Sequence, residues 1–224
     1  MDTKYTVIES NIENNITQLN TDKGRYYQTP EGKIYPSSTT VVGLLNKKAI
    51  EQWEQRVGKE KADQIRTEAA AHGSRWHLLM EDTLNKGKQK LSFTHEFCRC
   101  YKKVLKDVFP NITKVHAVEQ RMYSDEIEVA GTADLIADYN GVCTILDWKT
   151  TSHFKSAQDV ISYWCQLASY AVMAKERMNL DVKQFVLVFN DSDVNVYTLQ
   201  DCRIEMWIEN FKKLRLKYKQ LTGE

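Results

Sequence analysis

The sequence is poor in the residues and patterns that mark fibrous, disordered or membrane-spanning chains. Its 224 residues include 3 prolines and 9 glycines, too few for a collagen-like or low-complexity protein. No apolar run approaches the roughly 18 residues that a membrane-spanning helix requires. The first residues also lack the basic segment and apolar stretch of a secretory signal. We therefore expect a cytoplasmic protein with no membrane partner.

The cysteines and the net charge exclude further classes. The five cysteines are odd in number and include no C-x-x-C pair, so we expect free thiols rather than disulfides, a zinc ribbon or an iron–sulfur cluster. The net charge is +1, from 31 basic and 30 acidic side chains. This balance argues against a protein that coats nucleic acid by charge alone, although a local basic stripe is still compatible with it.

The patterns divide the chain into four regions. Residues 1–35 are predicted to form an arm, or a loosely packed strand, and then a hairpin, because aromatic and β-branched residues flank a turn with Pro and Gly. Residues 36–110 show helical spacing of apolar residues, begun by a Ser-Ser cap and interrupted at Gly58. We expect the sheet core in residues 111–200 and a closing helix in residues 201–224.

After Pro110 the period of the apolar residues changes from about 3.6 to 2, which is typical of strands. Three successive strands follow, and Asn140-Gly141 between the second and third is a strong hairpin signal. We therefore expect an antiparallel meander, a helix and further strands. The predicted strands span residues 115–123, 127–139 and 142–149, the helix residues 157–177, and the later strands residues 185–189 and 194–199.

The second and third strands of the meander carry the residues with the clearest chemical potential. Asp147 and Lys149 are two residues apart and so point to one face of the sheet, and Asp134 lies on the preceding strand. If pairing places Asp134 beside Asp147, two carboxylates and a lysine converge, as a site for a hard divalent cation requires. Such a cation polarises a phosphodiester and lowers the pKa of water, while Lys149 orients that water or offsets negative charge. The alternative interpretation is the polar face of a half-exposed sheet.

The context of this triplet is more specific than the triplet itself. A D/E-x-K triplet also occurs at residues 2–4, 31–33 and 181–183, as expected by chance for so short a pattern. Only the triplet at 147–149 ends an apolar strand, follows a tight hairpin and is preceded by Gly131-Thr-Ala-Asp134. This combination of G-x-x-D and D-W-K-T resembles the PD-(D/E)XK nuclease superfamily, and more narrowly its RecB-like exonuclease branch.

Further motifs strengthen the resemblance because they follow in the expected order. Residues 36–41 (P-S-S-T-T-V) and 73–81 (G-S-R-W-H-L-L-M-E) are similar to helical motifs of mitochondrial genome-maintenance and phage exonucleases, and Gln166-x-x-x-Tyr170 is similar to a motif on the helix after the catalytic strand. The resemblance implies an α/β fold with a PD-(D/E)XK (restriction-endonuclease-like) core of helix, three antiparallel strands, helix and strand. It also implies an N-terminal helical cap and a single nuclease domain over residues 1–224.

The resemblance assigns roles to individual residues. Asp134 and Asp147 would be metal ligands, completed by His77 from a helix, and Lys149 would be the catalytic lysine. Glu119 would face the site from a strand and take part in catalysis through water. Taken alone, His77 also fits a core or helix-surface histidine, and Glu119 an ordinary edge charge. The expected cofactor is Mg²⁺ or Mn²⁺, and no iron–sulfur cluster is expected because the cysteines that hold one in related proteins are absent.

Residues near these groups are candidates for contact with nucleic acid. The expected phosphate contacts are Arg75, Thr150, Thr151, Ser152 and Lys155. Trp76, Trp148 or Tyr170 are expected near bases, where stacking tolerates any sequence. Gln166 and Tyr170, one helical turn apart, would hydrogen-bond the DNA backbone and brace Lys149, or else pack their helix on the sheet. Glu81 lies one turn after His77 on the same helix face and would hold a water or orient His77, or else be a solvated charge.

The leading hypothesis is a metal-dependent DNA exonuclease that acts on single-stranded DNA or DNA ends in recombination, repair or genome processing. A phage origin fits this hypothesis, and the compartment would then be the host cytoplasm. Two alternatives use the same fold: a structure-specific endonuclease, and a catalytically inactive nucleic-acid-binding subunit. Retention of Asp134, Asp147 and Lys149 together argues against the second. The expected partners are DNA and a recombination or replication protein.

Overall fold

Two sheets flanked by helices make up the part of the chain that the computed structural model describes, namely residues 15–92, 94–152, 154–191 and 196–224. The predicted arm falls largely on residues 1–14, which lie outside the described residues. No helix in the described ranges has an apolar stretch long enough to cross a bilayer. The predicted α/β fold class is confirmed.

The smaller sheet is the predicted hairpin with one added strand. It consists of β1 (Thr17–Thr21), β2 (Gly24–Gln28) and β3 (Ile34–Pro36), paired antiparallel in that order. The N–H of Ser37 donates to the carbonyl of Arg25 at 2.8 Å, and Ser37 forms an isolated parallel bridge with Ala130. These contacts connect the end of the smaller sheet to the strand that carries Ala130, which is remote in sequence.

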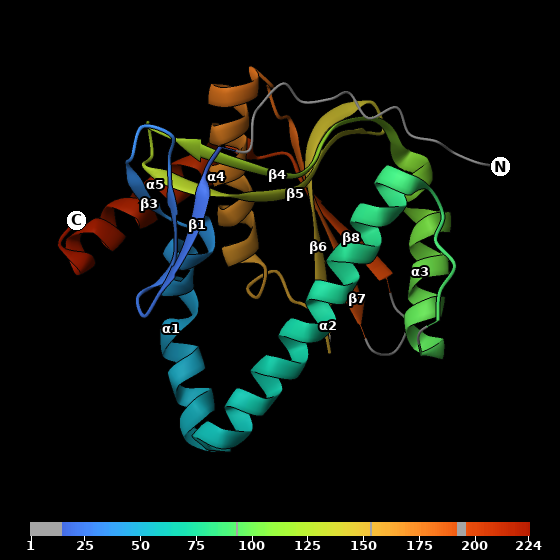
Figure 1. Ribbon diagram of the computed structural model, residues 1–224, viewed down its shortest axis with the longest axis horizontal. Helices are drawn as coiled ribbons and strands as arrows, with labels where there is room; N and C mark the ends of the chain where they lie inside the picture. Colours follow the sequence, from blue (N-terminus) through green and yellow to red (C-terminus); the bar gives the residue numbers. More distant parts are fainter. Residues whose placement is uncertain (1–14, 93, 153, 192–195) are drawn as a thin grey trace.

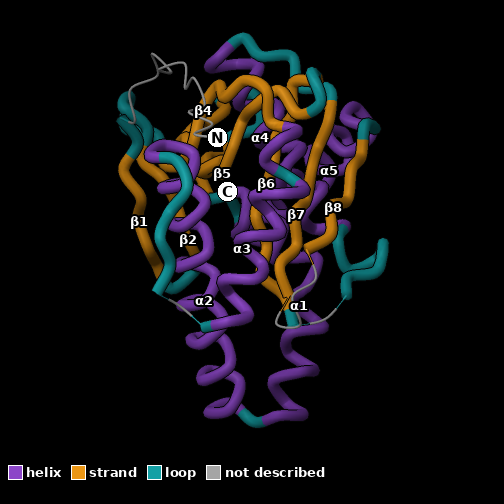
Figure 2. The backbone as a smooth tube through the Cα atoms, turned by 90° about the vertical axis from the view of Figure 1, so that its right-hand side faces the viewer, coloured by secondary structure: helices purple, strands orange, loops and turns teal. Residues whose placement is uncertain are grey.

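Two long helices follow, α1 (Ser38–Val57) and α2 (Lys59–Lys86). The Ser37 side chain caps α1, as predicted, by accepting a hydrogen bond from the N–H of Thr40 at 3.0 Å. The predicted interruption at Gly58 is confirmed, and its φ of 85° is a conformation that glycine adopts without steric cost. The two helices form a hairpin whose joined end projects from the rest of the molecule (Figures 1 and 2).

The larger sheet has five strands in the order β4-β5-β6-β7-β8. This part of the chain contains α3 (His95–Asp107), a 3₁₀ turn (Phe109–Asn111), β4 (Ile112–Ser124), β5 (Val129–Tyr139), β6 (Val142–Thr151), α4 (Ile161–Met178), β7 (Gln184–Asp191), β8 (Val196–Asp201) and α5 (Ile204–Thr222). The predicted antiparallel meander of β4, β5 and β6 is confirmed. β6 and β7 are parallel, and α4 makes the crossover that a parallel pair requires.

Helix α4 begins later than predicted. The sequence pattern placed its start at residue 157, whereas the helix starts at Ile161. The N–H and the hydroxyl of Ser156 both donate to Oδ2 of Asp159, at 2.8 and 2.7 Å. These local bonds stabilise a turn that competes with the first helical turn.

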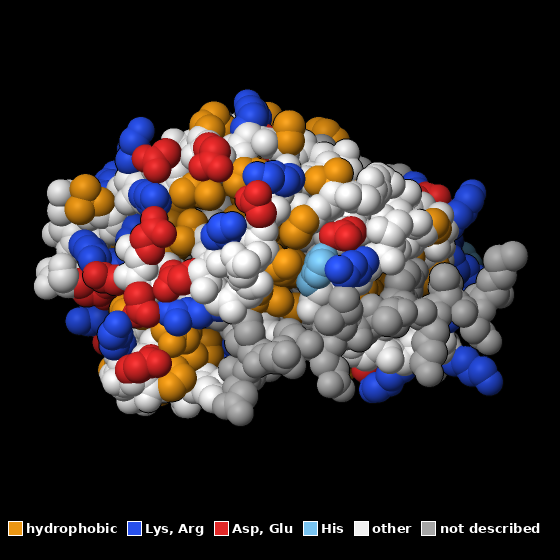
Figure 3. All heavy atoms as spheres, turned by 90° about the horizontal axis from the view of Figure 1, so that it is seen from above, with side chains coloured by type: hydrophobic (Ala, Val, Ile, Leu, Met, Phe, Trp, Pro, Cys, Tyr) orange, Lys and Arg blue, Asp and Glu red, His pale blue; other side chains and the backbone are white. Residues whose placement is uncertain are grey.

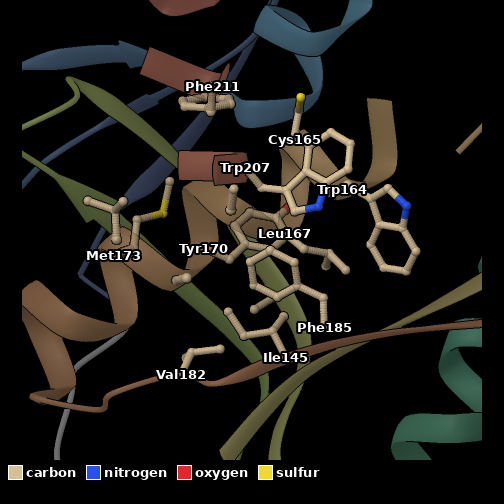
Figure 4. Packing of buried hydrophobic residues seen from close by; sticks show 14 of the residues in the cluster. Ile145, Trp164, Cys165, Leu167, Tyr170, Met173, Val182, Phe185, Trp207 and Phe211 are labelled. Carbon is tan, nitrogen blue, oxygen red and sulfur yellow. The ribbon is translucent and has the colours of Figure 1, made fainter. Parts of the chain in front are cut away.

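Apolar side chains pack on both faces of the larger sheet. On one face, α4 and α5 bury a cluster that includes Trp164, Phe185 and Trp207 (Figure 4). On the other face, α2 and α3 bury a second cluster that includes Leu146 and Val186. Figure 1 shows these helix pairs on opposite sides of the sheet. Strand β6 is therefore covered on both faces, and its end lies between α2 and α4.

Candidate active site

Asp134 and Asp147 lie where β5 and β6 stop pairing. The last paired residues are Leu135 and Leu146, and beyond them Oδ2 of Asp134 accepts the N–H of Trp148 at 2.9 Å, in place of a backbone carbonyl. Asp134 is 7% exposed and Asp147 is 1% exposed. Buried carboxylates at one place repel each other and require cations or hydrogen-bond donors to compensate them.

Lys149 supplies part of this compensation. Its Nζ lies 2.7 Å from Oδ2 of Asp147, as their spacing on one face of the strand predicts. Nζ also donates to Oε1 of Gln166 at 3.4 Å and lies 5.1 Å from the centre of the Tyr163 ring, a cation–π contact. Oδ1 of Asp147 is buried and has no hydrogen-bond partner among the described residues. An unpaired buried oxygen costs free energy, and a ligand at this oxygen would remove that cost.

His77, Glu119 and Asp134 form a second set of potential ligands. Nδ1 of His77 lies 3.4 Å from Oδ2 of Asp134 and 3.8 Å from Oε1 of Glu119. One ligand atom from each of the three residues lies within 4.8 Å of the others. Helix α2 therefore presents His77 to the sheet, and β4 presents Glu119 to the same point. Asp147 lies beside this set and is paired with Lys149.

The backbone conformation at Glu119 is unusual for a strand. Its φ is 47° in the middle of β4, a left-handed conformation that costs a residue with a side chain about 1 to 2 kcal/mol. Strain of this kind persists only where the surrounding structure maintains it, and it is frequent at functional sites. The distorted strand places the Glu119 carboxylate beside His77.

The charges at this point shift each other's pKa. Burial disfavours charged His77, but the neighbouring Asp134 and Glu119 carboxylates outweigh it and raise the pKa of His77 to about 10. Burial raises the pKa of Asp147 to about 6, although Lys149 opposes the shift. Burial also raises the pKa of Glu119, against the effect of His77. Without a further cation, Asp147 and Glu119 therefore ionise less readily than exposed carboxyl groups do.

Gln166 and Tyr170 reach the site from α4. They are 6% and 3% exposed, and Nε2 of Gln166 donates to the Tyr170 hydroxyl at 2.9 Å. The Tyr170 ring lies against Gly131 of β5, where a Cβ atom would come within 2.7 Å of ring atom Cε1. Gln166 thus contacts Lys149, and Tyr170 packs on the sheet. Contact of this pair with the DNA backbone stays a prediction.

A cavity of about 500 Å³ opens over these residues. The predicted site residues in its lining are His77, Glu81, Glu119, Asp134, Asp147, Lys149, Gln166 and Tyr170. The sequence pattern did not single out the other polar residues of the lining as site residues; these are Gln18, Arg25, Tyr27, Ser37, Thr39, Arg121 and Thr132. Three of them lie in motifs, since Ser37 and Thr39 belong to the P-S-S-T-T motif and Thr132 to the G-x-x-D motif. The others lie on the smaller sheet and on β4, and these segments are remote in sequence and meet only in the tertiary structure.

The predicted phosphate contacts lie outside this lining. Arg75 on α2 and Ser152 after β6 are exposed, while Thr150, Thr151 and Lys155 are partly buried. Helix α2 passes close to the end of β6, since a Cβ atom on Gly73 would lie 3.5 Å from Oγ1 of Thr150. Contact of these five residues with nucleic acid stays a prediction.

The prediction that Trp76 or Trp148 lies near bases is wrong. Their side chains are 0% and 1% exposed. The Trp76 ring packs edge-on against Phe97, with centres 5.2 Å apart, and the Trp148 ring stacks on Phe109 at 6.0 Å. Strand alternation explains the position of Trp148, because it lies between two residues that face the cavity and so points to the opposite face, into the core.

The sequence is similar to those of known nucleases. The sequence model of the PD-(D/E)XK nuclease superfamily matches residues 22–218. The mitochondrial genome maintenance exonuclease 1 of Xenopus tropicalis is 27% identical over 129 residues, which are 54% of this chain and 36% of the relative. The protein of the same name from Homo sapiens is 24% identical over 151 residues, which are 58% of this chain and 43% of the relative. The chain thus spans less than half the length of these curated relatives. A solved structure from Eubacterium rectale superposes with a TM-score of 0.49 and 10% identity, over 69% of this chain and 66% of that chain.

Proposed function

The chain belongs to the PD-(D/E)XK nuclease superfamily, and we propose that it is a metal-dependent exonuclease that hydrolyses phosphodiester bonds in DNA. One observation carries the proposal: two buried carboxylates, Asp134 and Asp147, share a cavity with the Lys149 ammonium group. An ordinary polar sheet face would expose these charges to water. Burying them is costly, and such clusters are characteristic of functional sites.

The residues present fit a divalent cation. His77, Glu119 and Asp134 offer ligand atoms within 4.8 Å of one another, and Oδ1 of Asp147 is a buried oxygen without a hydrogen-bond partner in the described part of the chain. Three carboxylates and one imidazole suit Mg²⁺ or Mn²⁺. His77 would have to lose its proton to act as a ligand. When bound, such a cation polarises the phosphodiester and lowers the pKa of a water molecule.

The other residues of the cavity supply positioning and proton transfer. Lys149 is held between Asp147 and Gln166, where its charge would orient water and stabilise negative charge that develops on the phosphate. Glu119 lines the cavity beside His77, where the carboxylate oxygen that does not bind the cation would accept a proton through a water molecule. Glu81 lines the same cavity and would bind a water beside His77.

The proposed substrate is a single strand or a free DNA end. The cavity volume of about 500 Å³ is within the range of pockets that enclose one small molecule, which is compatible with one nucleotide unit at the site. Arg75, Thr150, Thr151, Ser152 and Lys155 would contact phosphates further along the strand. The curated relatives are named exonucleases. These names support the proposal of a role in recombination, repair or genome processing, and a structure-specific endonuclease is the second candidate.

The test uses linear and circular DNA, single-stranded and double-stranded, with labels at the 5′ or the 3′ end. The wild type should degrade linear DNA in Mg²⁺ or Mn²⁺, leave closed circles intact and be inactive in EDTA. Asp147→Asn should be inactive, and Asp181→Asn, which changes an exposed carboxylate away from the cavity, should retain activity. Cleavage of closed circles would favour the endonuclease, and full activity of Asp147→Asn would refute the site.

A further inference from the structure

The cavity contains two arginines that the proposed chemistry does not use. Arg25 of β2 and Arg121 of β4 belong to its lining and are exposed to solvent. On the face seen in Figure 3, Lys and Arg side chains are interspersed with Asp and Glu. The net charge of the chain is only +1, so attraction of a polyanion depends on local groups such as these two.

The register of the larger sheet fixes the position of Arg121 relative to the acidic residues. Arg121 pairs with Thr132 of β5. Glu119 is two residues away from Arg121 on β4, and Asp134 is two residues away from Thr132 on β5. Two strand residues span about 7 Å, a step similar to the spacing of successive phosphates along an extended nucleic-acid strand. Measured along β5, the strand pair Arg121–Thr132 therefore lies about one phosphate further along the cavity than Asp134.

Arg25 borders the same part of the cavity from the smaller sheet. The Tyr27 hydroxyl lies 3.4 Å from Oγ1 of Thr132, and Arg25 is two residues from Tyr27, on the same face of β2. The backbone of Arg25 is held by Thr40 and Ser37: its N–H donates to Oγ1 of Thr40 at 3.1 Å, and its carbonyl accepts the N–H of Ser37 at 2.8 Å. The backbone of Arg25 is thus held in place, and the residue is exposed and belongs to the cavity lining.

We propose that Arg25 and Arg121 form a second phosphate subsite, which binds the phosphate next to the scissile one in a single nucleic-acid strand. The inference rests on the proposed nuclease function and names the group that would keep the strand in register. Guanidinium groups donate paired, charge-assisted hydrogen bonds to phosphate oxygens, which makes arginine the preferred residue for such a subsite. Gln18 and Thr39, which also line the cavity, offer further polar contacts to the same group.

A single neutral linkage in the substrate tests the subsite directly. The substrate is a short end-labelled single-stranded oligonucleotide, either with all phosphates or with one uncharged methylphosphonate linkage at a known position. Cut positions are mapped in Mn²⁺. The wild type should cut the bond beside the neutral linkage about 10- to 100-fold more slowly than the same bond in the all-phosphate strand, because hydrogen bonds between charged groups contribute about 1.5 to 3 kcal/mol each.

The variants Arg25→Gln, Arg121→Gln and the double change should remove this discrimination, so that the double variant cuts both strands at rates within about 2-fold of each other. Each lost contact should also lower the slope of log affinity against log salt by about 0.7, as expected for single strands. Arg99→Gln, an exposed change on α3, is the matched control and should keep the wild-type ratio. Melting temperatures verify that each variant is folded.

The outcomes separate the two proposals. If the double variant discriminates against the neutral linkage as strongly as the wild type, the second subsite is refuted while the nuclease function stands. If the wild type does not cut the all-phosphate strand with Mg²⁺ or Mn²⁺, the nuclease function is refuted and the subsite with it.

Discussion

The Tyr170 ring lies so close to Gly131 that a Cβ atom at this glycine would be 2.7 Å from Cε1 of the ring. The Tyr170 hydroxyl accepts a hydrogen bond from Gln166, whose Oε1 in turn accepts one from Lys149. The glycine of the G-x-x-D motif is thus connected through two α4 side chains to the lysine of the D-x-K triplet. Its lack of a side chain allows the close approach of α4 to β5.

Gly131→Ala should therefore disturb both stability and activity. The Tyr170 ring has to move, since a contact of 2.7 Å is not tolerated, and overpacking of this kind costs about 1 to 3 kcal/mol. Cleavage should slow as well, because Gln166 loses its position beside Lys149. The control is Gly43→Ala in α1, where nothing lies within 4 Å of the added Cβ atom and alanine should stabilise the helix by about 0.5 to 1 kcal/mol. Urea unfolding and cleavage rates measure both effects, and equal stability of the two variants would contradict the close contact.

Lys149→Ala should lose most of the cleavage rate and keep metal binding. The change removes the ammonium group that lies against Asp147. It leaves every proposed metal ligand in place. A positioned catalytic group contributes roughly 10²- to 10⁴-fold to a rate, so the loss should lie in this range. Single-turnover cleavage and calorimetric titration with Mn²⁺ separate the two properties. Lys183→Ala, which removes an exposed lysine paired with Asp181, should leave both unchanged. A rate within a few fold of wild type in Lys149→Ala would show that Lys149 is not catalytic.

The metal-free protein should lose stability as the pH rises through the titration of Asp147. Burial raises the pKa of this group from its ordinary value of 3.8 to about 6, so its ionisation is less favourable in the folded state than in the unfolded state. The stability that it contributes is present below about pH 4 and is lost as the pH rises through about 6. The loss should be no more than about 3 kcal/mol, the equivalent of this shift.

Asp147→Asn should flatten this part of the stability profile, since asparagine does not titrate. Chemical unfolding in EDTA between pH 4 and pH 8 compares the two proteins. Asp147→Asn should be at least as stable as the wild type at pH 8. Parallel profiles for the two proteins would show that Asp147 does not have a raised pKa.

The identity of the metal ion should affect DNA binding and DNA cleavage differently. Ca²⁺ should support DNA binding and little cutting, because its coordination is looser than the octahedral geometry of Mg²⁺. Mn²⁺ at 100 times its dissociation constant should stabilise the wild type by about 2.7 kcal/mol. His77→Ala and Asp134→Asn should reduce this gain, since both residues belong to the proposed ligand set. Thermal melts in each ion and gel-shift assays with labelled DNA provide the measurements, and an unchanged gain in both variants would place the metal elsewhere.

Local sequence patterns anticipated most of the fold. The change of period after Pro110 and the Asn-Gly turn predicted the meander of β4, β5 and β6, and Gly58 marked the break between α1 and α2. These features depend on residues that are neighbours in the chain, so periodicity and turn chemistry suffice to predict them. The start of α4 was missed because the Ser156–Asp159 turn is stabilised by side-chain bonds that compete with the helix.

The order of residues along β6 is enough to predict that Asp147 and Lys149 lie on one face of the strand and meet at one place. Three other features follow from the packing of remote segments: the smaller sheet brings Arg25 to the cavity, Glu119 adopts a left-handed conformation, and Trp148 is buried. Side-chain direction along a strand follows from local geometry. Burial, strain and the meeting of remote segments depend on how α2, α4 and the smaller sheet pack around the larger one, and no local pattern contains that packing.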